Sequence, residues 1–170
     1  SGVTRVPDKK NSNTLTADDF AKIFAVNVTG SYQMVSVAKP FLKKTKGSII
    51  NISSHSGFSG MGSSIAYAAS KGALNTLTFG LARSLSPEIR VNAVCPAIID
   101  TPMQAAVLQT VSEERGLSVE ELTELRNSSV PMGRSGKPEE LARLIWFLLS
   151  DGGGYMTGQS VNFGGGYVTW

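Results

Sequence analysis

The chain has 170 residues, of which 41% are hydrophobic and 17% are charged, and its formal net charge is +3. This length is enough for one domain with a sizeable core, and this composition excludes a disordered chain. The lysines and arginines are scattered, with no basic stripe interleaved with aromatic residues, so we expect no binding to nucleic acid.

Cysteine content and hydropathy bear on the compartment. The single cysteine, Cys95, permits no internal disulfide, which is typical of a reducing environment. No apolar run is long enough to span a membrane, and no signal peptide is recognisable. We therefore expect a cytoplasmic protein without a membrane partner.

The first element predicted is a long helix with one irregular position. The first fifteen residues are polar and rich in turn formers, which predicts a loop. Thr16 then begins a T-x-x-D box, and apolar residues at helical spacing predict a helix up to about Thr45. Asn27 disturbs this helix, because asparagine competes for backbone hydrogen bonds and Gly30 weakens the turn. This break in a local rule indicates either a kink or a functional position.

A strand follows, and a serine lies at its end. Residues 47 to 52, GSIINI, are apolar and β-branched, which predicts a strand. Ser54 comes just after it. In a parallel α/β sheet the carboxyl ends of the strands line the ligand crevice, so this hydroxyl is placed to bind a substrate oxygen.

The next segment, from about Ser64 to Ser84, has the composition and spacing of a helix. Tyr67 and Lys71 are four residues apart and so lie on one helical face. We expect the lysine ammonium to lower the pKa of Tyr67 from its ordinary value of about 10 and make the phenol usable as an acid/base. A tyrosine and a lysine at this spacing also commonly decorate a solvated face.

The remainder of the chain alternates strands and helices. EIRVNAVCP predicts a second strand, and its connection through a helix implies a right-handed crossover in a parallel sheet. Residues from about 104 to 130 form a polar, helix-rich excursion with a break at Gly116 and a new cap at Ser118. A helix with Pro138 in its first turn and a short final strand complete the pattern.

The segment around the first strand resembles the active-site signature of the short-chain dehydrogenase/reductase family. It has a strand ending in N-I-S-S, a tyrosine thirteen residues after Ser54 and a lysine four residues further on. The resemblance implies that Ser54 holds the substrate oxygen and that Tyr67 gives or takes its proton. It also implies that Tyr67 and Lys71 contact the cofactor and that Lys71 binds its ribose hydroxyls. Asn27, in N-V-T-G, matches an asparagine whose backbone carbonyl, in a kinked helix, holds a water that links the lysine to solvent.

A second match concerns the cofactor, NAD or NADP. The segment 96–103, PAIIDTPM, looks like the family's P-G-x-x-x-T motif, which begins here at Pro96 and meets the nicotinamide end. The resemblance implies that the backbone of Ile99 pairs with the carboxamide and that Thr101 adds a hydroxyl contact. Ala97 stands where the family usually has glycine, and Gly164 stands where it usually has aspartate.

The resemblance implies a partial α/β fold, a Rossmann-like doubly wound parallel sheet of which this chain holds strands five to seven with flanking helices. Residues 1–170 would form one partial domain, with a substrate lid at about 102–130. No G-x-G-x-x-G motif occurs, and Ser1 and Gly2 look like the tail of the family's N-N-A-G turn. We expect a missing N-terminal segment, in cis or in trans, to cover the fifth strand, since parallel edges are normally buried.

The implied function is hydride transfer between NAD or NADP and a small-molecule carbonyl or secondary alcohol, of ketone, polyol or 3-oxoacyl type, by a homotetramer or homodimer without a metal. One alternative is a non-catalytic fragment or assembly subunit that needs the missing N-terminal half. Another is a hydrolase built on Ser54 and His55, although neighbouring residues rarely face each other and no G-x-S-x-G elbow is present.

Overall fold

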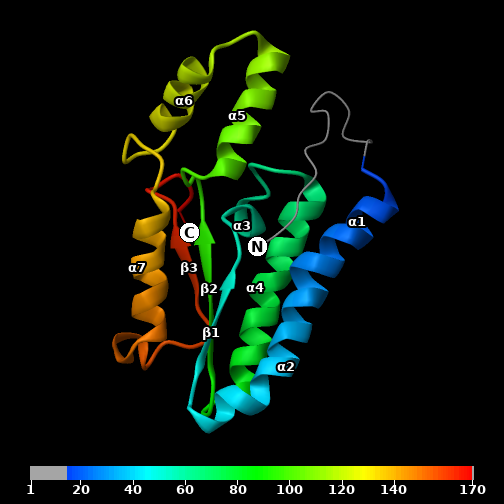
Figure 1. Cartoon of the computed structure of the whole chain (residues 1–170), viewed down its shortest axis with the longest axis vertical. Helices are drawn as coiled ribbons and strands as arrows, with labels where there is room; N and C mark the ends of the chain where they lie inside the picture. The colour runs from blue at the N-terminus through cyan, green and yellow to red at the C-terminus, as the bar shows by residue number, and fades with distance from the viewer. Residues whose placement is uncertain (1–14, 170) are drawn as a thin grey trace.

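The computed structural model describes residues 15–169, apart from the side chain of Met103 (Figure 1). The loop predicted for the first fifteen residues, with Ser1 and Gly2, therefore lies outside the described residues except for Leu15. The helices are α1 (Ala17–Phe24), the π turn η2 (Ala25–Gly30), α2 (Ser31–Lys44), α3 (Ser56–Ser59), α4 (Ile65–Leu85), α5 (Pro102–Arg115), α6 (Val119–Ser128), α7 (Pro138–Leu149) and the 3-10 turn η3 (Asp151–Gly153). The strands are β1 (Ser48–Ile52), β2 (Arg90–Pro96) and β3 (Ser160–Phe163).

The three strands form one parallel sheet in the order β1-β2-β3. Ser48 of β1 is in register with Arg90 of β2, and Ala93 of β2 is in register with Ser160 of β3. Helices connect successive strands, as parallel pairing requires. The predicted α/β fold with a parallel sheet and flanking helices is confirmed.

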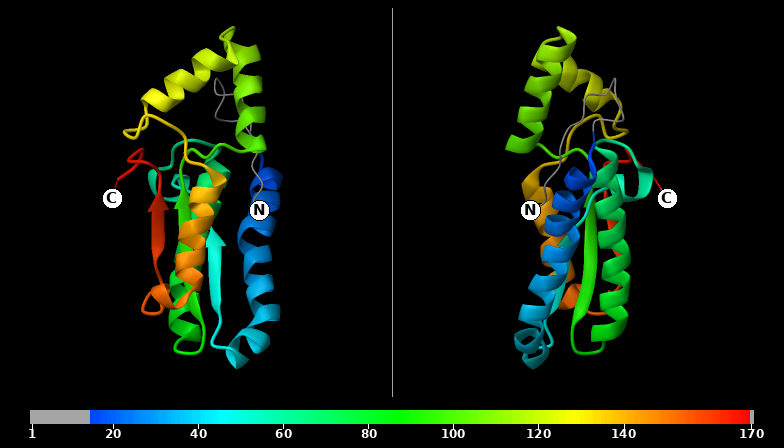
Figure 2. Two further views of the ribbon diagram at one scale, coloured as in Figure 1. Left: turned by 60° about the vertical axis from the view of Figure 1, so that its left-hand side comes forward. Right: turned by 90° about the vertical axis from the view of Figure 1, so that its right-hand side faces the viewer.

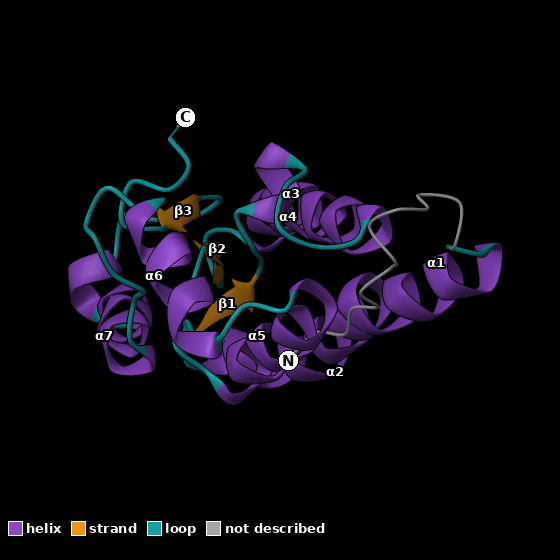
Figure 3. Cartoon of the chain, turned by 90° about the horizontal axis from the view of Figure 1, so that it is seen from above, coloured by secondary structure: helices purple, strands orange, loops and turns teal. Residues whose placement is uncertain are grey.

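The helices cover both faces of the sheet. The rod made of α1, η2 and α2 lies beside α4 on one face, and α7 lies on the other (Figures 2 and 3). All three strands point the same way, and α3, α5 and α6 lie at their carboxyl ends (Figure 1). Any ligand crevice is therefore expected at this end.

The core lies between β2 and the helices on the α4 face. Val91 of β2 is fully buried and packs with Val35 of α2 and with Leu81 and Leu85 of α4. Cys95, also fully buried in β2, has its thiol pKa raised to about 11 by burial. Cys95 therefore packs as a small buried hydrophobe.

The long helix predicted from Thr16 to Thr45 forms, but it is interrupted. Thr16 caps α1 through a capping box in which its Oγ1 accepts from the Asp19 N–H at 3.2 Å. Around Asn27 the helix widens into η2, which accounts for the irregular position in the sequence. Of its apolar side chains only Ile23 in α1 and Val35 in α2 are buried within the chain.

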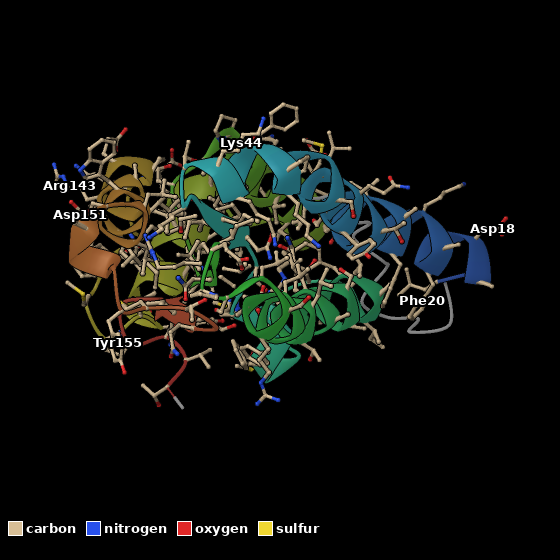
Figure 4. The ribbon with its side chains drawn as sticks, turned by 90° about the horizontal axis from the view of Figure 1, so that it is seen from below. Asp18, Phe20, Lys44, Arg143, Asp151 and Tyr155 are labelled. Atoms are coloured by element: carbon tan, nitrogen blue, oxygen red, sulfur yellow. The ribbon has the colours of Figure 1, made fainter. Side chains whose placement is uncertain are left out.

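Other apolar side chains face outward. Tyr32 and Phe41 of α2 are 52% and 67% exposed. Phe20 and Tyr155 lie at the periphery of the molecule (Figure 4). The apolar stripe of the predicted long helix is thus mostly left uncovered by the described residues.

The outer edge of β1 has no strand partner among residues 15–169. Beside it a groove of about 680 Å³ is lined by the rod helix and the strand, including Val26, Met34, Ile49 and Ile52. This is the edge at which the sequence predicts a missing neighbour.

The polar excursion folds as predicted into two helices, α5 and α6. Gly116, with φ of +67°, ends α5 in the left-handed conformation that glycine favours. Ser118 then caps α6 by accepting from the Glu121 N–H at 3.1 Å. None of the helices that the structure describes is long and apolar enough to cross a bilayer.

Arg90 joins the end of α7 to the sheet. Its guanidinium donates to the carbonyls of Leu148, Gly153 and Met156 through Nη1, at 2.8, 2.9 and 3.3 Å. Nη2 donates to the carbonyls of Leu149 and Ser150. One side chain therefore satisfies carbonyls that the helix end leaves without intrahelical partners.

Candidate active site

Ser54 lies at the carboxyl end of β1, where the backbone leaves the sheet. The preceding Ser53 N–H still bonds to the Val94 carbonyl at 2.8 Å, so the strand pairing continues up to the serine. The Ser54 side chain is buried, and its Oγ accepts from the Ser56 N–H and donates to the Ser56 Oγ, both at 3.2 Å. The position of Ser54 is thus fixed by the strand pairing before it and by the hydrogen bond from the Ser56 N–H after it.

Tyr67 and Lys71 approach this serine from α4, which begins at the Ser64 cap. The Tyr67 hydroxyl is near enough to the Ser54 side chain for this serine to lower the tyrosine pKa in part. Lys71 is only 3% exposed, and its Nζ lies 5.5 Å from the centre of the Tyr67 ring. The structure therefore brings together the three residues that the sequence predicts for proton transfer.

The protonation of this group departs from the sequence-based expectation. Burial raises the pKa of Tyr67, and the nearby Ser54 side chain opposes this only in part. Burial also lowers the pKa of Lys71 to about 8, and its Nζ donates to the Ile52 carbonyl at 2.7 Å. The expectation that Lys71 lowers the tyrosine pKa is wrong for this arrangement, because desolvation of the phenol outweighs the other contributions.

Asn27 packs against the same helix. It is 1% exposed, and its Nδ2 donates to Ser70 Oγ at 3.0 Å, while Ser70 Oγ donates to the Tyr67 carbonyl at 2.7 Å. The Asn27 carbonyl accepts from Ser31 Oγ at 3.0 Å. Asn27 thus supports the turn between Tyr67 and Lys71, and its role in holding a water stays a prediction.

The turn after Ser54 packs directly against the backbone of α4. A Cβ on Gly57 would lie 2.7 Å from the Lys71 carbonyl carbon and 2.8 Å from the Gly72 nitrogen. Ser53 Oγ also donates to the Lys71 carbonyl at 3.0 Å. These contacts hold the turn that carries Ser54 at a fixed distance from the turn of α4 that carries Lys71.

The segment predicted to meet the nicotinamide follows β2. A parallel bridge joins Ile99 to Gly136, using the Ile98 carbonyl and the Asp100 N–H, both at 2.9 Å. In such a bridge the amide and carbonyl of Ile99 point away from Gly136, and among residues 15–169 neither has a partner. They are therefore free to pair with a carboxamide.

The two other residues predicted in this segment have structural partners. Thr101 caps α5, since its Oγ1 accepts from the Gln104 N–H at 3.3 Å while its hydroxyl proton remains available. Pro96 ends β2, and its carbonyl accepts from the backbone N–H of His55 at 3.1 Å. Their cofactor contacts stay predictions.

The position of the His55 side chain could not be predicted from the sequence. Its Nδ1 lies 3.2 Å from the Pro96 carbonyl, and its ring meets Tyr167 edge-on at 5.4 Å. Burial lowers its pKa, which keeps the ring neutral near pH 7. The ring thus ties the Ser54 turn to the end of β2, and it is not paired with Ser54 as a hydrolase would require.

No group of three or more His, Cys, Asp or Glu side chains in the described part of the chain is arranged to hold a metal ion.

Comparison with known proteins decides the family. The family model described as Enoyl-(Acyl carrier protein) reductase matches residues 2–168. The chain belongs to the short-chain dehydrogenase/reductase family. The expected resemblance is thereby confirmed over nearly the whole chain.

The relatives differ in what their names describe. A tropinone reductase homolog of Datura stramonium is 37% identical over 97% of this chain and 59% of its own length. The human (3R)-3-hydroxyacyl-CoA dehydrogenase is 40% identical over 89% of this chain and 55% of its own length. The structure of ElxO with NADP bound is 30% identical, with a TM-score of 0.81, and is covered over 64% of its chain against 98% of this one. The chain thus spans somewhat more than half the length of the relatives it matches.

Proposed function

We propose that this chain carries the catalytic part of an NAD- or NADP-dependent oxidoreductase that acts on a small-molecule carbonyl or secondary alcohol. The observation that carries the proposal is the meeting of Ser54, Tyr67 and Lys71 at the carboxyl end of β1. A protonated phenol, a serine hydroxyl and a buried amine grouped at one strand end can hold a carbonyl oxygen and give it a proton.

The raised pKa of Tyr67 favours a definite role. At neutral pH the phenol stays protonated and is an acid, so in the reducing direction it donates its proton to the oxygen that Ser54 holds. Lys71 has a pKa of about 8 and is poised to replace that proton near neutral pH. In the oxidising direction the same groups act in reverse.

A bound nicotinamide cofactor would supply or accept the hydride in this reaction. The residues fit such a group on this side of the site: Ile99 offers an unpaired amide and carbonyl, and Thr101 a hydroxyl. Lys71 uses one of its three N–H donors on Ile52, which leaves two for ribose hydroxyls.

We further propose that residues 102–130 act as a substrate lid and that residues 1–170 belong to one cytoplasmic domain. The unpaired edge of β1 and the groove beside it would be covered by the N-terminal part of the fold, in cis or in trans. The exposed apolar residues Val37 and Phe41 of α2, which lie outside that groove, support a homodimer or homotetramer.

The alternative is a non-catalytic fragment or assembly subunit. The observation that favours it is the incomplete coverage of the relatives together with the open β1 edge. It predicts that the chain binds a partner but neither NADH nor NADPH.

The test is a Tyr67→Phe substitution in the natural polypeptide, assayed by the oxidation of NADH and NADPH with a panel of ketones. Loss of the proton donor should lower kcat by about 100-fold or more, and the exposed Tyr32→Phe variant should retain full activity. A Tyr67→Phe enzyme that keeps more than about a tenth of the wild-type kcat would exclude the tyrosine as acid.

A further inference from the structure

One arginine of the lid, Arg126, is directed inward. It lies in the last turn of α6 and is partly buried. When the amide of Gln104 is oriented with its oxygen toward Arg126, that oxygen accepts from Nη2 at 3.1 Å and from Nε at 3.2 Å, and it also contacts Nη1. The backbone N–H of Gln104 in turn donates a hydrogen bond to Thr101 Oγ1. Arg126 is therefore anchored beside the segment proposed to meet the nicotinamide.

On its other side Arg126 is close to the tyrosine above the serine turn. Tyr167 is near enough to influence the Arg126 pKa, and its ring lies 5.4 Å from the ring of His55. His55 follows Ser54 directly in the chain. Arg126 therefore belongs to the pair of helices, α5 and α6, that lies at the carboxyl ends of the strands (Figure 1).

This guanidinium has no carboxylate partner within residues 15–169. The lid's neighbour Arg134, in contrast, is paired with Glu140 at 2.7 Å. Burial lowers the pKa of Arg126, but an arginine keeps its charge at neutral pH. Removing a cation from water without a counter-ion is unfavourable, and an incoming anion would relieve this. The planar fork of arginine suits carboxylate and phosphate oxygens.

We propose that Arg126 binds an anionic group of the substrate, a carboxylate or a phosphate, while the substrate's carbonyl reacts at Ser54 and Tyr67. The proposal rests on the proposed function, and it restricts the substrate class to oxo acids, hydroxy acids or phosphorylated ketones. Arg126 is then a specificity-determining residue that neutral ketones do not use.

The test compares matched substrates in the natural polypeptide. Acetoacetate and its methyl ester form one pair, and 2-oxopropylphosphonate and its dimethyl ester form the other, so the two pairs distinguish carboxylate from phosphate recognition. Arg126→Gln should lower kcat/KM for the favoured anion by about 10- to 100-fold and leave the neutral ester within about threefold. Arg115→Gln removes the same charge from an exposed position of α5 and should change neither.

The outcomes separate the two proposals. An equal loss for anion and ester, or no loss for either anion, would overturn the role of Arg126 while leaving the reductase activity established. If the unmodified enzyme reduces no carbonyl, the proposed function fails, and binding of malonate and of phosphonoacetate then decides the role of Arg126. One of these anions should raise the Tm of the unmodified protein and of Arg115→Gln but not that of Arg126→Gln, and an equal shift in all three would refute the site.

Discussion

The contact between Gly57 and α4 predicts that a single methyl group will disturb the active site. In Gly57→Ala the added Cβ would lie 2.7 to 2.9 Å from three backbone atoms of Lys71 and Gly72. Ordinary van der Waals contact begins near 3.4 Å, so the turn and the helix must separate by roughly 0.7 Å. Backbone atoms have no rotamer with which to avoid this overlap.

Overpacking of this kind typically costs about 1 to 3 kcal/mol in the free energy of unfolding. The same separation moves Ser54 away from Lys71, and a displacement of this size should lower kcat/KM on the order of tenfold. Urea denaturation of the natural polypeptide measures the first effect, and steady-state kinetics with NADH or NADPH measures the second.

A matched control lies in the same helix. Gly80 is exposed in α4, and a Cβ there meets nothing within 4 Å. Gly80→Ala should therefore stabilise the protein by about 0.5 to 1 kcal/mol, because alanine favours helix over glycine. If Gly57→Ala were as stable and as active as Gly80→Ala, the close packing of turn on helix could not be what positions Ser54.

Two further predictions concern stability. The pKa of Lys71 falls from 10.5 to about 8 on folding, so between these pH values the unfolded chain holds more protons and the free energy of unfolding rises with pH. Lys71→Met should lack this rise, which is on the order of 3 kcal/mol, and parallel pH profiles of the two proteins would contradict it. Arg90→Lys, which keeps the charge but loses the forked donors to the end of α7, should lower the free energy of unfolding by about 1.5 to 3 kcal/mol. Exposed Arg83→Lys should leave it unchanged in the same urea titration.

Much of the fold could be predicted because its signals are local. The caps at Thr16, Ser64 and Ser118 and the proline at position 138 lie where the helices begin. Apolar, β-branched runs mark the strands. The meeting of Ser54, Tyr67 and Lys71 followed from one strand end and one helical spacing, both contained in a short stretch of sequence.

What could not be predicted depends on contacts between distant residues. The bond between His55 and Pro96 joins positions 41 residues apart. The direction of the Tyr67 pKa depends on how much water the packed helices exclude, which no spacing reveals. The inward position of Arg126 requires α5, α6 and the C-terminal turn to be placed first.

The π turn around Asn27 sets the rotational phase of the rod helix. Its two buried apolar residues, Ile23 before the turn and Val35 after it, are twelve positions apart. At about 100° per residue an unbroken α-helix would direct them about 120° apart, toward different neighbours. A turn with i→i+5 bonds, about 4.4 residues per turn, removes about 110° over its six residues and brings both onto one face. Asn27 thus lies at a built-in angular offset that accommodates one extra residue. If one residue were deleted there, an unbroken α-helix would place Ile23 and Val35 about 20° apart, so both would still face the core.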